Sequence, residues 1–213
     1  MAMSAKSWGP NTRAPRRKSE GWLDTIMDMT LTVGDDGIPR CPWGDSAAMR
    51  DYHDSEWGRE VRGDQLLYER MTLEAFQSGL SWAIVLRKRD RFREVFARFD
   101  PEVVAGFGES ETAALLTDPG IIRNRLKIDA AINNARVICG LGESLTELLW
   151  SFAPGAVPAP TSYDQVPAVT TESSAMAKEL KRRGFRFVGP TTAYALMQAT
   201  GMVNDHLEGC VAR

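Results

Sequence analysis

The chain has only two histidines in 213 residues, and each lies in a motif that also supplies a cysteine. His53 follows Cys41 in the first motif, and His206 precedes Cys210 by four residues near the end of the sequence. Two thiolates and two imidazoles form the ligand set of a closed structural zinc site, which leaves no position open for water or substrate. Such a site ties residues near 41–53 to the C-terminal end and so constrains the whole fold.

The spacing of these four residues leaves a second interpretation open. His206 and Cys210 lie on one face of a helical turn or around a short loop, whereas the first pair is more loosely spaced. Isolated cysteines are usually small buried hydrophobic residues, and isolated histidines are usually satisfied by hydrogen bonds. Spacing alone does not decide between these interpretations.

Length and composition indicate an ordinary globular chain. With 213 residues, 43% of them hydrophobic, it can bury a core as one domain or two small lobes. Three cysteines, an odd number, argue against a disulfide framework. The N-terminal residues include Pro, Arg and Lys where a signal peptide needs an apolar core, and no apolar run reaches about 18 residues. We expect a cytoplasmic protein without a membrane partner, for which a monomer suffices.

The net charge of −2 is nearly balanced, but the basic residues are clustered. Either the clusters converge on a surface that binds phosphate, or they are ordinary solvated helix faces. The three clusters are Arg87, Lys88, Arg89, Arg91 and Arg93; Arg123, Arg125 and Lys127; and Lys181, Arg182, Arg183 and Arg186.

The pattern of apolar residues predicts an all-α fold. Residues 1–38 are interrupted by Gly, Pro, Asn and Ser and are expected to form a flexible extension, followed by a helical domain over residues 39–213. We expect helix starts at Asp100, Ser110, Ser144 and either Ser173 or Ser174, from their capping residues. Helical periodicity covers residues 66–79, 82–99 and 121–138.

A helix-hairpin-helix is predicted over about residues 178–201. A helix closing at Gly184 is followed by Val188, Gly189 and Pro190, and then by an apolar helix that ends at Gly201. This motif binds DNA independently of its sequence, because hairpin amides and the N-terminus of the second helix point at a phosphate.

Several long motifs together resemble the type I 3-methyladenine DNA glycosylases of the helix-hairpin-helix superfamily. The resemblance runs from about Cys41 to Cys210 and rests on the segments 41–44, 52–58, 73–82, 120–128, 181–189 and 203–206. It implies a monofunctional enzyme of base excision repair that flips 3-methyladenine out of alkylated double-stranded DNA, hydrolyses its glycosidic bond and leaves an abasic site. It also implies that Cys41, His53, His206 and Cys210 hold a structural zinc ion.

The resemblance assigns roles in base recognition to four residues. Trp43, Tyr52 and Trp82 match the base-stacking positions, although each ring can also be plain core. Glu74 is the catalytic candidate: its carboxylate accepts hydrogen bonds from the exocyclic amine of the damaged base and balances its positive charge. Burial near aromatic rings is expected to raise the proton affinity of Glu74. The alternative is an exposed glutamate or a buried ion pair.

Two further segments are expected to contact DNA. Gln77, Gly79 and Leu80 match the loop that enters the gap left by a flipped nucleotide, although Gly79 also suits a helix C-cap. In the hairpin, the candidates for DNA binding are Val188, Gly189 and Thr191.

Two other functions compete with this interpretation. A non-enzymatic helix-hairpin-helix protein that binds or senses alkylated DNA needs neither Glu74 nor the aromatic set. A hydrolytic zinc enzyme is disfavoured because all four plausible ligands are used. Asp205 is not assigned as the catalyst, since it adjoins His206 and the family lacks a catalytic aspartate there. No lysine follows the hairpin helix, so lyase activity is not expected.

Overall fold

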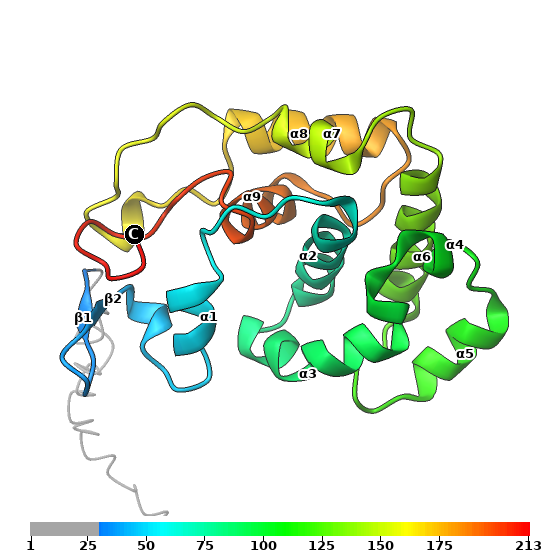
Figure 1. Ribbon diagram of the computed structural model, residues 1–213, viewed down its shortest axis with the longest axis horizontal. Helices are drawn as coiled ribbons and strands as arrows, with labels where there is room; N and C mark the ends of the chain where they lie inside the picture. The colour runs from blue at the N-terminus through cyan, green and yellow to red at the C-terminus, as the bar shows by residue number, and fades with distance from the viewer. Residues whose placement is uncertain (1–29) are drawn as a thin grey trace, which may run out of the picture.

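The structure is a computed structural model that describes residues 30–213, and in that range it is almost entirely helical, as the sequence predicts (Figure 1). Two short strands pair antiparallel, with Thr32 opposite Arg40. The elements in order are β1 (Thr32–Val33), β2 (Pro39–Arg40), η1 (Pro42–Gly44), α1 (Arg50–Ser55), α2 (Asp64–Gln77), α3 (Trp82–Val95), η2 (Ala97–Phe99), α4 (Pro101–Ala105), α5 (Glu109–Thr117), α6 (Arg125–Cys139), α7 (Leu145–Trp150), η3 (Tyr163–Gln165), α8 (Thr171–Arg182) and α9 (Pro190–Ala199).

Helix α2 lies at the centre of the molecule and is buried on most of its surface (Figure 1). It contacts α3, α6, α7 and α9, which surround it. Phe76 near its end packs edge-on against Phe92 of α3, with ring centroids 4.7 Å apart. A helix that is buried all round must satisfy or tolerate its polar residues inside the protein. Two such residues, Glu69 and Glu74, are each 6% exposed.

Capping residues explain where the helices begin. Asp100 caps α4, its carboxylate accepting from the amide of Glu102, and Ser144 with Glu147 forms the predicted capping box of α7. Two predicted starts were wrong. Helix α5 begins at Glu109 after Gly108, and Thr170 caps α8, its hydroxyl accepting from the amide of Ser173 at 3.1 Å.

The periodicity over residues 121–138 overestimated the length of one helix. Helix α6 begins only at Arg125, where the side chain of Asn124 accepts from the amide of Lys127 at 3.2 Å. The apolar residues Ile121 and Ile122 pack against the core without being helical. Buried apolar residues in an irregular segment therefore imitate a helical repeat.

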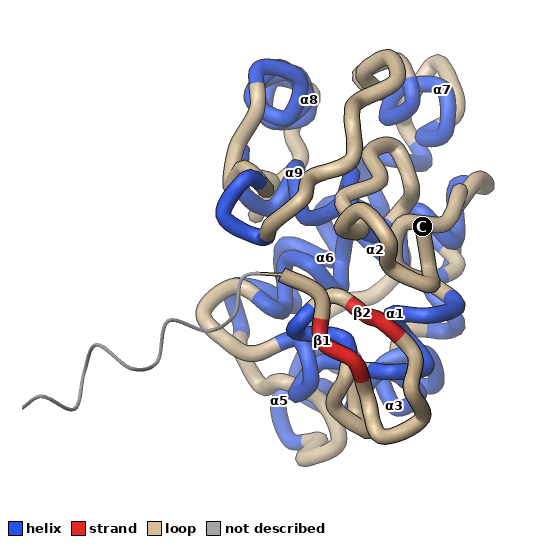
Figure 2. The backbone as a smooth tube through the Cα atoms, turned by 90° about the vertical axis from the view of Figure 1, so that its left-hand side faces the viewer, coloured by secondary structure: helices blue, strands red, loops and turns tan. Residues whose placement is uncertain are grey.

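Residues 30–38, which we expected to belong to the extension, form the first strand and the turn of the β1–β2 hairpin. The guanidinium of Arg40, 2% exposed, holds this turn by binding Asp36 at 2.8 Å and Asp54 at 2.9 Å. The amide of Val211 donates to Pro39 O at 3.0 Å, so the C-terminal segment lies beside the hairpin (Figure 2). Residues 1–29 of the expected extension lie outside the described residues.

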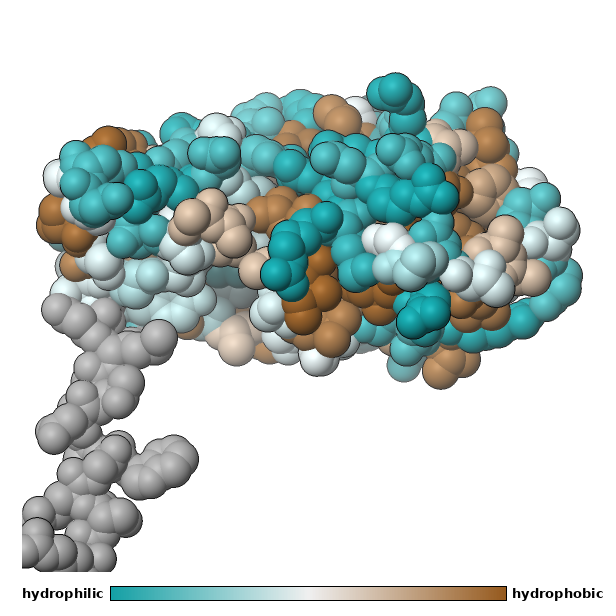
Figure 3. All heavy atoms as spheres, turned by 90° about the horizontal axis from the view of Figure 1, so that it is seen from below, coloured by the Kyte–Doolittle hydropathy of each residue, from teal (hydrophilic) through white to brown (hydrophobic). Residues whose placement is uncertain are grey.

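The surface carries both hydrophilic and apolar side chains. Seen from below, hydrophilic side chains cover most of the molecule and apolar side chains gather in patches near its middle (Figure 3). Among residues 30–213 we find no helix with the length and apolar character required to cross a bilayer.

We expect Gly201→Ala to lower the free energy of unfolding by about 2 kcal/mol or more, because its φ of +72° is in the left-handed region. The added Cβ would also lie 2.6 Å from the backbone of Arg59. Chemical denaturation measures the change. Gly142→Ala, whose Cβ meets no atom within 4 Å, is the control and should stay within about 0.5 kcal/mol of the wild type. Equal stability of the two variants would contradict the packing of the α1–α2 connection against the end of α9.

Candidate active site and metal centre

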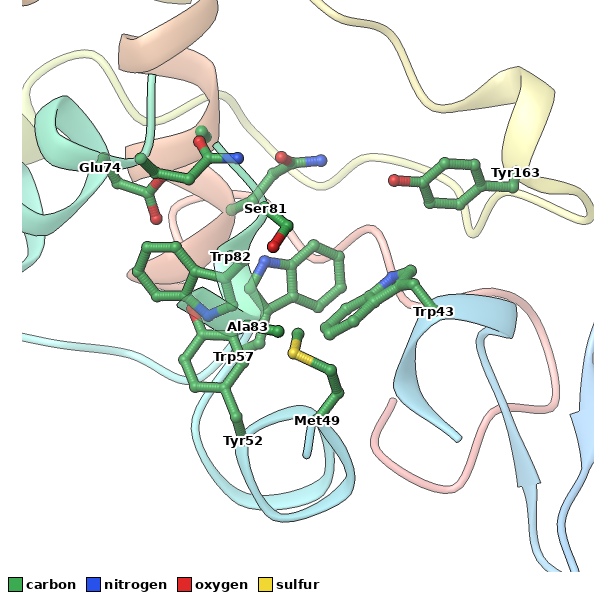
Figure 4. Close-up of a pocket in the computed structure, with 12 residues that line it drawn as sticks. Trp43, Met49, Tyr52, Trp57, Glu74, Ser81, Trp82, Ala83 and Tyr163 are labelled. Carbon is green, nitrogen blue, oxygen red and sulfur yellow. The ribbon is translucent and has the colours of Figure 1, made fainter. Parts of the chain in front are cut away.

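A cavity of about 390 Å³ opens between α1, the α2–α3 junction, α9 and the turn that carries Tyr163 (Figure 4). Segments that are far apart in the sequence therefore meet around one space. Its lining residues are Trp43, Met49, Tyr52, Trp57, Glu74, Gln77, Ser81, Trp82, Ala83, Tyr163, Ala195 and Gln198.

Aromatic side chains form much of the wall of this cavity. The rings of Tyr52 and Trp82 lie 5.3 Å apart, and those of Trp43 and Trp57 lie 4.9 Å apart. The indole N–H of Trp82 is buried and has no partner in the described part of the protein. Flat, electron-rich walls of this kind suit a planar ring, and a positively charged one best.

Glu74 brings a carboxylate to this aromatic cavity (Figure 4). The residue is 6% exposed, and its side chain forms no hydrogen bond or ion pair with any described residue. Burial raises the pKa of Glu74 to about 8, against a smaller opposing effect of the Arg70 charge. A buried carboxyl group that faces a cavity without a protein partner is available to a ligand, and a cationic ligand would favour its ionised form.

Glu56, which precedes Trp57 in the sequence, differs from Glu74 in that its carboxylate is paired. Its carboxylate accepts from Arg89 at 2.6 Å and from Arg70 at 2.9 Å. Burial alone would raise its pKa, but the hydrogen bonds from Arg89 and Arg70 lower the pKa of Glu56 to about 2. Glu56 is therefore fully engaged inside the protein, and Glu74 is not.

The loop after α2 lies at the same cavity and reaches the surface. Gln77 lines the cavity, and Leu80 is 38% exposed. Gly79 between them has a φ of +82°, which only glycine adopts without strain. The loop therefore presents backbone and one apolar side chain beside the entrance to the cavity.

The hairpin between α8 and α9 exposes two of the three residues predicted to bind DNA. Gly189 and Thr191 are exposed at the start of α9, where the amides of Thr191 and Thr192 have no partner among the described residues. These free amides at a helix N-terminus suit an anion. The side chain of Val188 is 8% exposed and packs in the core, so only its backbone remains for DNA.

The four ligand candidates from the two ends of the sequence come together in a buried cluster. Their ligand atoms lie within 4.8 Å of one another. Cys210 Sγ is 3.5 Å from His53 Nε2 and 3.6 Å from His206 Nδ1, and Cys41 Sγ is 3.7 Å from His206 Nδ1. A tetrahedral zinc ion with sulfur at about 2.3 Å and nitrogen at about 2.0 Å separates its ligands by about 3.6 Å. The donor set and its spacing therefore fit such an ion.

Outer partners orient both imidazoles toward the centre of the cluster. His53 Nδ1 lies 2.7 Å from Asp54, which leaves Nε2 facing inward, and His206 Nε2 lies 3.0 Å from Trp57 O, which leaves Nδ1 facing inward. Metal-binding histidines commonly have such outer partners. The pKa of the Cys210 thiol is lowered, first by its contact with Cys41 and then by the two histidines.

The aromatic wall and the cluster are in direct contact. The ring of Trp43 lies 4.9 Å from that of His53, and the ring of Trp57 lies 4.7 Å from that of His206. The cluster is thus the layer behind the cavity wall.

Most residues of the three basic clusters are engaged within the protein. Arg89 pairs with Glu56, Arg91 with Asp118, Arg93 with Glu69, Arg125 with Glu109, and Arg182 and Arg183 with Glu179. Lys88 and Lys127 donate to backbone carbonyl groups instead. The side chains of Arg87, Arg123, Lys181 and Arg186 form no hydrogen bond or ion pair with residues 30–213. For most of these clusters the structure favours ordinary helix faces over one continuous phosphate-binding surface.

Seven lining residues lie outside the predicted set: Met49, Trp57, Ser81, Ala83, Tyr163, Ala195 and Gln198. Trp57 and Ser81 lie within the motifs of the resemblance, so their position was a usable signal. Tyr163 lies in a Pro-rich connection whose sequence carries no signal for the site, because only the folded chain brings this turn to the cavity.

We expect Glu74→Gln to become more stable relative to the wild type as the pH rises. The pKa of Glu74 is about 8 when folded against an ordinary 4.5, so the folded wild type loses stability as the pH rises through this range. The advantage of the variant should grow by about 1–3 kcal/mol between about pH 5.5 and pH 8.5. Urea unfolding at several pH values measures it, and a difference independent of pH would contradict a buried, unpartnered carboxyl group.

Comparisons with known proteins agree with this geometry. A sequence model of the methyladenine glycosylase family matches residues 43–213. The chain is 43% identical over 179 residues to the DNA-3-methyladenine glycosylase 1 of Escherichia coli, covering 81% of this chain and 96% of that protein. It is 42% identical over 178 residues to the DNA-3-methyladenine glycosylase of Haemophilus influenzae, covering 80% and 96%.

Solved structures give the same result. A crystal structure of 3-methyladenine DNA glycosylase I superposes with a TM-score of 0.77 at 44% identity, covering 80% of this chain and 97% of that one. A structure of the Staphylococcus aureus 3-methyladenine DNA glycosylase I, described as the basis of 3-methyladenine recognition, superposes with a TM-score of 0.75 at 29% identity, covering 78% and 92%. With a matching family model and relatives above 40% identity over most of its length, the chain belongs to the methyladenine glycosylase family.

Proposed function

We propose that this protein is a monofunctional DNA glycosylase that removes 3-methyladenine from alkylated double-stranded DNA and leaves an abasic site. The observation that carries the proposal is Glu74, a buried carboxyl group that has no partner among residues 30–213 and lies in an aromatic cavity large enough for a flipped base. The names of the relatives support the same substrate.

Charge provides the selectivity for the damaged base. Adenine methylated at ring nitrogen 3 is a cation while it is attached to the sugar, whereas normal adenine is neutral. The cationic base stabilises the Glu74 carboxylate and donates to it from its exocyclic amine. When normal adenine is bound, Glu74 is either protonated or an uncompensated buried charge. The neutral ring also lacks the cation–π attraction of the aromatic walls, so it binds more weakly.

Hydrolysis then requires few protein groups. The bond between the sugar C1′ and the base nitrogen breaks, its electron pair neutralises the positively charged base, and a water oxygen bonds to C1′ while its proton passes to solvent. Glu74 holds the base in the cavity during this step. Asp205 accepts from the Tyr194 hydroxyl at 2.6 Å and from Gln198 at 2.8 Å, so its carboxylate is occupied by structural contacts.

DNA is held at two places in this proposal. A phosphate binds at the free amides of Thr191 and Thr192, next to Gly189, and the loop with Gln77, Gly79 and Leu80 enters the gap that the flipped nucleotide leaves. A single chain carries all of these groups, so we propose that the protein acts as a monomer. We also propose a cytoplasmic location.

We further propose that Cys41, His53, His206 and Cys210 hold a structural zinc ion. The four donors use all positions of a tetrahedral ion, so the metal takes no part in the reaction. It links the segment around α1 to the C-terminal segment and supports Trp43 and Trp57 through the histidine rings.

Base release tests the enzymatic function. Wild-type protein should release 3-methyladenine from methylated duplex DNA, and Glu74→Gln should slow single-turnover release by roughly 100-fold, because the developing contacts to the base are lost. Chromatography of the released bases measures this and also shows whether 3-methylguanine is excised. Glu69→Gln is the control, because Glu69 is equally buried in α2 but pairs with Arg93 away from the cavity. Tight binding of methylated duplex without any release by the wild type would favour a protein that senses damage.

Metal analysis tests the zinc site. The purified protein should contain about one zinc ion per chain, and Cys210→Ser or a strong chelator should lower the melting temperature by several degrees or more, since the cross-link between distant segments is lost. Cys139→Ser, which changes the exposed cysteine outside the cluster, should leave both values unchanged. Metal-free protein with an unaltered melting temperature would show that the cluster is an ordinary buried core.

A further inference from the structure

Lys127, in the first turn of α6, is a buried lysine whose ammonium group is used inside the protein. The residue is 7% exposed. Its Nζ donates to Phe76 O at 2.8 Å and to Ser78 O at 2.6 Å. Both acceptors belong to the end of α2 and the loop that follows it, 49 to 51 residues away in the sequence. Burying a charged group is costly unless its donors are satisfied, so these contacts specify a definite arrangement.

The contacts of Lys127 complete the hydrogen bonding of the loop over residues 77–80. Gln77 O accepts from the amide of Leu80 at 2.7 Å, and Leu80 O accepts from the side chain of Gln77 at 3.3 Å. With Phe76 O and Ser78 O bound by Lys127, four carbonyl groups at this helix end have partners. A helix end normally leaves its last carbonyl groups unpaired and mobile, so the loop is held in one shape with Leu80 exposed.

Helix α6 holds the DNA-binding hairpin as well. The side chain of Asn134, 1% exposed, accepts from the amide of Arg186 at 2.8 Å and donates to Arg186 O at 3.0 Å. Asn133 donates to Gly184 O at 2.8 Å. One rigid helix therefore fixes both segments that face DNA, the loop near its start through Lys127 and the hairpin through its middle.

We propose that Lys127 is a positioning residue for base flipping: it keeps the 77–80 loop as a preformed wedge, at a fixed distance from the hairpin, so that Leu80 separates stacked bases without first ordering the loop. The inference rests on the proposed function. Ordering several loop residues on binding would cost free energy at each of them. A preformed wedge does not incur this cost, so more of the free energy of binding is available to unstack the duplex.

The test separates the wedge from the base pocket. A duplex with a stable abasic-site analogue and an adjacent 2-aminopurine becomes fluorescent when its stacking is broken. We expect Lys127→Met to lose most of this fluorescence rise and to slow single-turnover excision by about tenfold. Binding of free 3-methyladenine, followed by tryptophan fluorescence, should change less than about twofold, because Lys127 does not line the cavity. Lys127→Arg, which retains charge and donors, should restore part of the unstacking.

Asn134→Ala is the matched comparison, because it releases the hairpin and leaves the wedge contacts intact. It should weaken duplex binding while the fluorescence rise at saturating protein persists. An equal loss of free-base binding and unstacking in Lys127→Met would show a general structural role and overturn the proposal. Unstacking by Lys127→Met at the wild-type level would overturn it too, because the loop would then not need Lys127. If Lys127→Met does not fold, Lys127→Gln, which keeps one donor, replaces it with the same criteria. Absence of base release by the wild type would overturn the proposed function instead, since unstacking at the analogue is measured without excision.

Discussion

The buried cluster of Cys41, His53, His206 and Cys210 is the constraint on which the site depends. Each cysteine–histidine pair comes from one end of the described chain, and the four ligand atoms lie within 4.8 Å of one another. This contact brings α1 against the C-terminal segment and places Trp43 and Trp57 at the cavity. A small protein could bury these ends hydrophobically, but the zinc ion that we propose, bound by four directed ligands, fixes their geometry more precisely than packing alone.

Against this wall lies one buried carboxyl group, Glu74, that has no partner among residues 30–213. Arg70 and Arg89 are both engaged by Glu56, and Glu69 is engaged by Arg93. Glu74, on the same helix as Glu69, is equally buried but faces the cavity. The raised pKa of Glu74 is the energetic consequence of its burial. In the function that we propose, the positive charge of the damaged base stabilises the ionised carboxylate, so base binding relieves this unfavourable burial.

Helix α6 links the two segments that we propose to contact DNA. The wedge loop and the hairpin are separated by more than 100 residues in sequence, yet Lys127, Asn133 and Asn134 of α6 hold them both. Their hydrogen bonds go to backbone atoms, so they fix the course of the loops without restricting which side chains the loops carry. In the function that we propose, this rigid helix sets the distance between the loop that enters the duplex and the hairpin that binds a phosphate.

The sequence by itself determined the all-α class, through helical periodicity and capping residues. Its motifs, through the resemblance, also predicted which cysteines and histidines cluster and that Glu74 and three aromatic residues lie together at the cavity. It misplaced the starts of α5, α6 and α8, where competing caps such as Thr170 were equally compatible with the local pattern. Only the tertiary structure decided that Val188 is buried, that Tyr163 reaches the cavity, and that Lys127 binds the wedge loop rather than solvent. The physical reason is that burial and partner choice depend on segments far away in the chain, whereas helix periodicity and ligand spacing are properties of neighbours.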